Sequence, residues 1–172
     1  MEFILAQFFG LLASLALITS VQFKKKSHIL ILTIVSAISF TISFALLGAW
    51  SGAMICFVGT FVTLTIFLLE KYGRKVSWPI VLVFVVAKTV SWAFFYQTWY
   101  DVLPLVGTLF WLASVLQRNE NRLRWILLVS SAAWIIYGII TAAYASVLAD
   151  VLTIASTVIA LIRYRKVADK QK

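Results

Sequence analysis

Long apolar runs separated by short polar or basic connections make up most of the 172-residue chain. Within each run the apolar residues are continuous and do not alternate with polar ones, which predicts helices and not the strands of a barrel. About 20 mostly apolar residues are enough for a helix to cross a membrane. Seven such helices are predicted, at residues 3–23, 28–50, 53–69, 78–98, 101–117, 125–142 and 144–162.

The amino-acid composition excludes most soluble classes of protein. Apolar residues make up 63% of the chain and charged residues 12%, whereas a soluble domain is about half apolar and about a quarter charged. The chain has too few polar side chains to cover a water-soluble globule of its size. We therefore expect an all-α integral membrane protein that is surrounded by the lipid bilayer.

The positions of the basic residues predict how the chain is oriented. All lysines and arginines except Lys88 follow the first, third, fifth or seventh predicted helix. Basic connections stay on the cytoplasmic side of a membrane, so we expect the N-terminus outside and the C-terminus inside. The net charge of +9 then has a membrane explanation, and no nucleic-acid partner is expected.

The first three and the last three predicted helices share one layout. Each set begins outside, has a basic connection after its first helix and has a short outer hairpin, which we place at residues 51–52 in the first set and at Ala142 in the second. Both sets have the same orientation, which predicts parallel repeats with a solute site between them near the midplane of the membrane. The predicted units are bundle one at residues 1–76, a linker helix at 77–100, and bundle two at 101–172 with a short basic tail.

Two short runs near the C-terminus resemble a family of transporters. They are Trp134-Ile135-Ile136-Tyr137-Gly138, which is similar to Trp-x-x-Tyr-Gly, and residues 148–153, which are similar to Leu-Ala-Asn-x-x-Thr. Both patterns are those of the SWEET sugar transporters and their half-size bacterial relatives, the PQ-loop (MtN3-like) group. The resemblance implies a seven-helix SWEET-like 3+1+3 fold and the facilitated movement of a small solute, sugar-like or another small polar molecule.

Nearly the whole chain resembles the YgjV-type bacterial inner-membrane proteins. The shared stretches are residues 5–7, 46–48 with 52–53, and 103–108. This resemblance implies a multi-pass protein of the bacterial cytoplasmic membrane. Neither repeat contains the Pro-Gln dipeptide of the PQ-loop group, so a second reading stays open, in which a non-transporting membrane scaffold or regulator retains the fold.

Trp134 and Asp150 are the leading candidates for a solute site. Each lies eight residues from Ala142, which at 1.5 Å per residue places both roughly 12 Å into a hydrocarbon layer about 30 Å thick. An aromatic ring and a carboxyl group at one depth could hold a small polar molecule, and acids inside membranes are usually functional. Alternatively, Trp134 packs between helices and Asp150 stabilises the start of the last helix.

The first repeat offers different residues at the matching positions. Ser39 corresponds to Trp134 and Ile55 corresponds to Asp150, with Cys56 next to it. Ser39 and Cys56 are therefore added to the predicted site, which we expect to be asymmetric.

Lys88 lies in the middle of the fourth predicted helix. An ammonium group at that depth costs a few kcal/mol, so it should face a wet cavity or pair with an acid. Asp150 is the natural partner by depth and Asp101 is the second choice. Equally, the flexible lysine stem could carry the charge to backbone carbonyl groups or water.

Pro104, Gly107 and Gly10 are candidate hinge residues, although glycines in such helices also permit close packing. The sequence contains no His/Cys cluster with metal-ligand spacing and no glycine-rich phosphate loop, so neither a metal nor a cofactor is expected. No nucleophile–base pair is apparent, so we do not expect an enzyme. A chain that holds both repeats could work as a monomer, and a homo-oligomer stays open.

Overall fold

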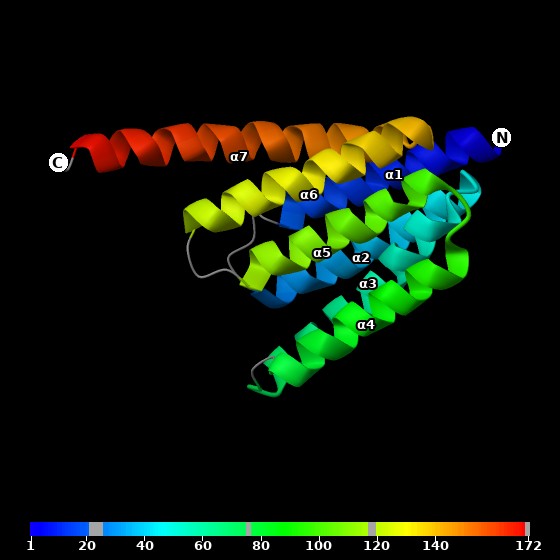
Figure 1. Ribbon diagram of the computed structural model, residues 1–172, viewed down its shortest axis with the longest axis horizontal. Coiled ribbons are helices and arrows are strands. Elements are labelled where there is room, and N and C mark those ends of the chain that lie inside the picture. The colour runs from blue at the N-terminus through cyan, green and yellow to red at the C-terminus, as the bar shows by residue number, and fades with distance from the viewer. Residues whose placement is uncertain (21–25, 75–76, 117–119, 171–172) are drawn as a thin grey trace.

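The computed structural model describes residues 1–20, 26–74, 77–116 and 120–170, and within these ranges it contains helices and no strand (Figure 1). The basic residues at 24, 25, 75, 118 and 172 lie outside the described residues. The elements are α1 (Glu2–Ser20), α2 (Lys26–Leu46), α3 (Trp50–Lys71), α4 (Trp78–Phe95), the short 3₁₀ helix η1 (Trp99–Asp101), α5 (Val102–Leu116), α6 (Glu120–Ile140) and α7 (Tyr144–Lys170). The prediction of an all-helical chain with seven α-helices is confirmed.

Four helices are long and apolar enough to cross a membrane, among the residues described. These segments are Glu2–Ser20, Ser27–Leu46, Trp50–Lys71 and Trp78–Phe95. The remaining apolar helices are shorter, because α5 has 15 residues and the apolar parts of α6 and α7 are Arg124–Ile140 and Tyr144–Ile159. Membrane-crossing length is thus shown for four of the seven predicted spans.

The α2–α3 and α6–α7 hairpins end their first helix in the same way. Gly48 has a φ of 71° and Ala142 a φ of 55°, and in each case the next N–H bonds a carbonyl five residues back, at 2.9 Å from Ala49 and 2.8 Å from Ala143. This left-handed cap closes a helix sharply and usually uses glycine. The predicted turn at Ala142 is confirmed, whereas the turn predicted at 51–52 is wrong, because Gly48 ends α2 earlier and both residues belong to the first turn of α3.

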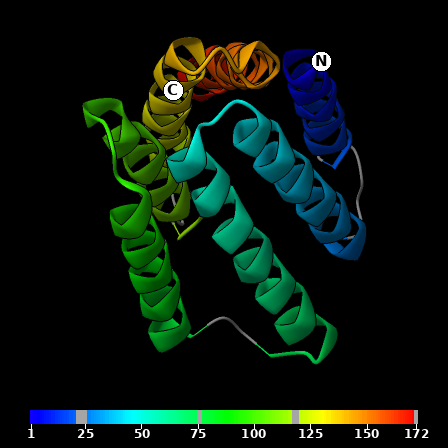
Figure 2. The same ribbon diagram turned by 90° about the vertical axis from the view of Figure 1, so that its right-hand side faces the viewer.

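We refer to α1–α3 and α5–α7 as the first and second helix groups, because neighbouring helices pack side by side within each set. In the first group α2 packs against both α1 and α3, and in the second group α6 packs against both α5 and α7. The groups meet where α7 contacts α1 and where α3 contacts α5, while α4 packs mainly on α3. Figure 2 looks onto the end that holds the N-terminus and shows α7 returning beside α1.

The two ends of the bundle differ, and we name them for what they hold. The hairpin end contains Met1, the α2–α3 and α6–α7 turns and η1, and it lies on the right in Figure 1. The opposite end, where α1, α3, α5 and α7 finish, is called the basic end, because the basic connections of the sequence follow those helices.

Small residues let the helices approach closely. A Cβ atom added at Gly52 would lie 2.7 Å from the Tyr137 ring, and one at Gly10 would lie 2.8 Å from the Ala145 side chain. Such contacts are typical of helices that associate in lipid, where tight packing replaces the hydrophobic driving force. Tyr137, with 0% exposure, is the largest fully buried side chain of the described core.

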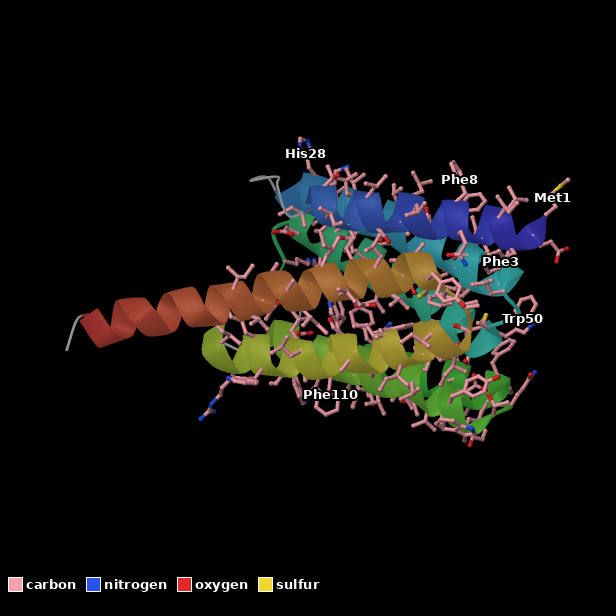
Figure 3. All side chains as sticks on the ribbon, turned by 90° about the horizontal axis from the view of Figure 1, so that it is seen from above. Met1, Phe3, Phe8, His28, Trp50 and Phe110 are labelled. Atoms are coloured by element: carbon pink, nitrogen blue, oxygen red, sulfur yellow. The ribbon has the colours of Figure 1, made fainter. Side chains whose placement is uncertain are left out.

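Large apolar side chains cover the outside of the bundle. Phe8 and Phe110 are 60% and 40% exposed, and Figure 3 shows them pointing away from the helices. An apolar outer surface of this extent suits contact with lipid and not with water.

Candidate functional site

A pocket of about 310 Å³ lies between the two groups of helices. Every α-helix except α4 contributes to it. Its described lining consists of Leu17, Phe40, Phe44, Cys56, Trp111, Leu127, Ser130, Ser131, Trp134, Ser146, Ala149, Asp150 and Thr153. Of the predicted site residues, the structure therefore brings Trp134, Asp150 and Cys56 together around one space, and Lys88 and Ser39 do not line it.

Asp150 is the only aspartate, glutamate, lysine or arginine among the described lining residues. It extends from the second turn of α7 and is half-buried, and its carboxyl group interacts with the Ser131 side chain of α6. Trp134 lies one turn further along α6 than Ser131. An aromatic ring, a hydroxyl and a carboxyl group from two neighbouring helices thus face the same space.

The other hydroxyl groups of the pocket donate their protons to backbone carbonyls. Ser130 donates to Gly107 at 2.7 Å, Ser146 to Ala143 at 2.9 Å, and Thr153 to Ala149 at 2.9 Å. A hydroxyl that donates in this way keeps its oxygen lone pairs as acceptors. The hydroxyls of the site are therefore better suited to accept hydrogen bonds than to donate them.

Trp134 is held in place by packing on both sides. Its ring lies 5.8 Å from that of Phe44 and 6.1 Å from that of Tyr137, measured between centroids. A Cβ atom at Gly107 would come within 2.7 Å of the indole, so glycine at this point of α5 lets the ring lie against the backbone. The role of Gly107 as a hinge stays a prediction, and its observed contact is the close approach to Trp134.

A hydrogen-bonded group that we call the Asp101 network joins the helix groups at the hairpin end. Ser51 of α3 donates to the Asp101 carboxylate, and the Tyr137 hydroxyl lies 2.9 Å from Ser51 Oγ and accepts from the Gly52 N–H at 3.1 Å. Because Ser51 gives its proton to Asp101, the Tyr137 hydroxyl donates to Ser51. The first and second helix groups are thus joined between Trp134 and the hairpin end.

The second carboxylate oxygen of Asp101 orders the connection between α4 and α5. It accepts hydrogen bonds from the Gln97 N–H at 3.0 Å, the Thr98 N–H at 2.7 Å and the Thr98 hydroxyl at 2.9 Å. Burial by itself raises the pKa of Asp101, but the hydrogen bonds from Ser51, Gln97 and Thr98 outweigh it and hold the pKa below its ordinary value. Asp101 is therefore a structural carboxylate that joins α3 to the connection between α4 and α5.

Gln7 makes a second link at the hairpin end. Its Nε2 donates to the Ala142 carbonyl at 2.7 Å, and its Oε1 accepts from the Ala145 N–H at 3.1 Å. Ser14, two turns further along α1, donates to the Ala145 carbonyl at 3.0 Å. These bonds attach α1 to the α6–α7 hairpin. The two helix groups are therefore joined at the hairpin end in two places, by the Gln7 and Ser14 bonds and by the Asp101 network.

Lys88 lies outside the pocket, between α4 and α3. It is 4% exposed, and its Nζ donates to the Ile55 carbonyl at 3.3 Å and faces Gly59. In the described part of the chain it forms no salt bridge with Asp150 or Asp101. The predicted pairing with an acid is therefore not found, whereas the predicted contact with a backbone carbonyl group is found. The absence of a side chain at Gly59 leaves room for the ammonium group.

The remaining candidates have packing environments. Ser39 is buried in α2 with 5% exposure, Pro104 is buried near the start of α5, and Gly10 contacts Ala145. Sequence reasoning missed Tyr137, Ser51 and Gln7 as site-forming residues. The Trp-x-x-Tyr-Gly run contains Tyr137, so this run was the signal that could have found Tyr137 and its partner Ser51.

Among the residues described, no group of three or more His, Cys, Asp or Glu side chains is placed to hold a metal ion.

Comparison with known proteins identifies the family alone. The chain matches no curated protein and no solved structure. The model of the Imp-YgjV family, described as bacterial inner membrane protein, matches residues 4–168, so the chain belongs to this family and is a protein of the bacterial inner membrane.

Proposed function

We propose that this protein moves a small solute across the bacterial inner membrane, with the pocket between α1–α3 and α5–α7 as the solute site. The observation that carries the proposal is the position of the Asp150 carboxyl group beside Trp134 in a space enclosed by both helix groups. A carboxyl group at membrane depth is costly and is retained mainly where it serves a pathway or a ligand. A pocket of about 310 Å³ is at the lower end of the range for small-molecule sites.

The proposed architecture is the SWEET-like 3+1+3 arrangement with seven spans. Residues 1–76 and 101–172 are the two bundles, and α4 within residues 77–100 is the linker, in agreement with its packing mainly on α3. With basic connections inside, the hairpin end faces the periplasm and the basic end faces the cytoplasm. One chain contains the complete pocket, so we propose that a monomer is sufficient.

The proposed conformation is closed toward the periplasm. The Asp101 network and the Gln7 bonds join the helix groups at the hairpin end. Opening on that side requires both links to break, and rocking of the bundles about the pocket would then expose Asp150 to the periplasm. Pro104, Gly107 and Gly10 are the positions at which the helices would bend during this change.

Cys56 provides a direct test, since it is the single cysteine of the chain and lines the pocket. A small membrane-impermeant methanethiosulfonate is added to right-side-out or inverted membrane vesicles, with Cys56→Ala as the background control. We expect faster labelling from the cytoplasmic side, and an increase in periplasmic labelling when Asp101→Asn and Gln7→Ala are combined. If Cys56 is labelled from neither side, the proposed pathway is wrong and a non-transporting scaffold is favoured.

Transport itself is tested by a binding screen followed by uptake. Purified protein is screened by thermal shift against sugars, amino acids and amines, and the compound that stabilises it most is then used for uptake into proteoliposomes. We expect Asp150→Asn and Trp134→Ala to reduce uptake, with Glu2→Gln as a control that removes a carboxylate outside the pocket. Unchanged uptake in both pocket variants would exclude the proposed site.

A further inference from the structure

We propose that the pocket selects an organic cation, a small molecule with a substituted ammonium group on a short apolar body, and not a neutral sugar. This inference rests on the proposed function, because it names the solute class of the same site. It is carried by the kind of polar atom in the lining, by the position of the aromatic rings and by the absence of a cation among the described lining residues.

Apart from the Trp134 indole N–H and the Cys56 thiol, the described polar side chains of the pocket offer mainly acceptors. Asp150 supplies a carboxyl group, and the hydroxyls of Ser130, Ser146 and Thr153 have already donated their protons to the backbone. Ser131 interacts with the Asp150 carboxyl. A sugar hydroxyl needs donors as well as acceptors around it, whereas an ammonium group needs acceptors only.

Aromatic rings form much of the remaining surface. Phe44 and Trp134 are 5.8 Å apart and Phe40 and Phe44 are 6.2 Å apart between ring centroids, so these three residues make a continuous wall. A cation is attracted by the face of an aromatic ring, most strongly by tryptophan, and this is the common means of recognising quaternary ammonium groups. The same wall also accepts the apolar body of the ligand.

The nearest basic side chain does not enter the pocket. Lys88 directs its Nζ to the Ile55 carbonyl on α3 and does not belong to the lining. The remaining described basic residues of the helices lie near the basic end, among them Lys71 and Arg124. A positively charged ligand therefore meets the Asp150 carboxylate without a competing ammonium or guanidinium group in the same space.

The test compares a cation with a neutral molecule of the same shape. Choline and 3,3-dimethyl-1-butanol differ in one atom and one charge, and benzylammonium and benzyl alcohol form a second pair. Binding to the purified full-length protein is followed by thermal shift and tryptophan fluorescence, at constant ionic strength with sodium chloride as the balancing salt. In at least one pair we expect the cation to bind about tenfold more tightly or better.

Four variants assign that preference to the pocket. We expect Asp150→Asn to weaken binding of the preferred cation by about tenfold to a hundredfold and to leave binding of its neutral partner unchanged. Asp150→Glu keeps the charge and should retain most of the preference, and Glu2→Gln serves as the matched control. Trp134→Leu should weaken cation binding by about threefold to thirtyfold, which gives a second readout if Asp150→Asn does not fold.

The outcomes separate this inference from the proposed function. If both pairs bind without preference for the cation, or if Asp150→Asn and Glu2→Gln have equal effects, the cation assignment is wrong. If a neutral sugar binds and is taken up while both cations do not, the assignment is also wrong but the transporter stands. If no compound binds and Cys56 is closed to water from both sides, the transporter itself is excluded.

Discussion

The pocket has two walls that differ in chemistry although their helices share one layout. The wall from α1–α3 presents three apolar side chains and a thiol, those of Leu17, Phe40, Phe44 and Cys56. The wall from α5–α7 also has apolar members, including Trp111 and Trp134, but it alone carries the described hydroxyl groups and the Asp150 carboxyl group. The hairpins above both walls have the same left-handed cap. A repeated backbone arrangement therefore does not require a repeated site, and here one half supplies an apolar surface against which the other half holds its polar groups.

Removal of a large ring should have the greatest effect, and it tests whether the two walls are equal in packing. Tyr137→Ala and Phe44→Ala each remove an aromatic side chain that is at most 2% exposed. We expect each to lower the free energy of unfolding by about 3–5 kcal/mol, because the cavity cannot be filled by the neighbouring helices. Unfolding in mixed micelles with SDS measures the change. Because the Tyr137 and Phe44 rings lie 5.7 Å apart between centroids, a loss confined to one variant would show that packing within its own helix group, and not the contact between the two rings, provides the stability.

Solute uptake should separate the walls by their chemistry. Asp150→Asn is expected to lower uptake of the bound solute by about tenfold or more, because it removes a charged hydrogen-bonding group. Cys56→Ser on the opposite wall removes no charge, and we expect a loss of less than about threefold. Initial rates in proteoliposomes measure both. Equal losses would mean that the polar groups of one wall do not determine recognition.

The contact between the walls at the hairpin end should depend on pH through Asp101. Its pKa is lowered in the folded protein, so the unfolded chain takes up the proton more readily and the carboxylate stabilises the fold above the unfolded pKa. That contribution is lost as the pH falls through the unfolded pKa and then the lower folded one. We expect a fall in Tm below about pH 4, where a carboxyl group of ordinary pKa takes up its proton.

Asp101→Asn is the matched variant for this prediction. At pH 7 it should cost about 1–2 kcal/mol, since the charge-assisted bonds from Ser51 and Thr98 are weakened. Its Tm should then fall less between pH 5 and pH 3 than that of the unaltered protein. Parallel curves for the two proteins would contradict the assignment of the acid-sensitive contact to this carboxylate.

The two hairpins offer the smallest and most specific test. Ala142 has a φ of 55° where the equivalent turn has Gly48 at 71°. Ala142→Gly should stabilise the protein by about 1 kcal/mol, and Gly48→Ala should destabilise it by about the same amount, because an L side chain is strained in the left-handed region. Thermal unfolding at pH 7 measures both. Two changes of the same sign would show that the hairpins are not equivalent.

The helix positions could be predicted well because membrane insertion depends on local composition. The predicted helix at 78–98 is observed at Trp78–Phe95, and the one at 101–117 is observed at Val102–Leu116. The turn predicted at 51–52 was wrong because α2 ends earlier, at the left-handed Gly48, and α3 begins at Trp50. Gly52 instead provides the flat surface on α3 that the Tyr137 ring contacts, and that requirement comes from a helix far away in the sequence.

Of the five predicted site residues, Trp134, Asp150 and Cys56 line the pocket, whereas Lys88 and Ser39 do not. Trp134 and Asp150 lie equally far from the Ala142 turn, and both line the pocket. Lys88 has a suitable depth as well, yet its side chain reaches the Ile55 carbonyl. Depth along a helix follows from counting residues, whereas the direction of a side chain around the helix axis depends on how neighbouring helices pack.

The sequence by itself determined that this is a helical membrane protein, where its helices lie, and that one carboxyl group and one ammonium group are buried among apolar residues. These properties follow from hydrophobic length and from residue counting, which need no knowledge of neighbours. Only the tertiary structure decided that Asp150 and Trp134 line one pocket while Lys88 lies outside it, and that Asp101, Ser51 and Tyr137 join the two helix groups. The physical reason is that close approach at Gly52, Gly107 and Gly10 sets the rotation of each helix, and that rotation selects which side chains meet.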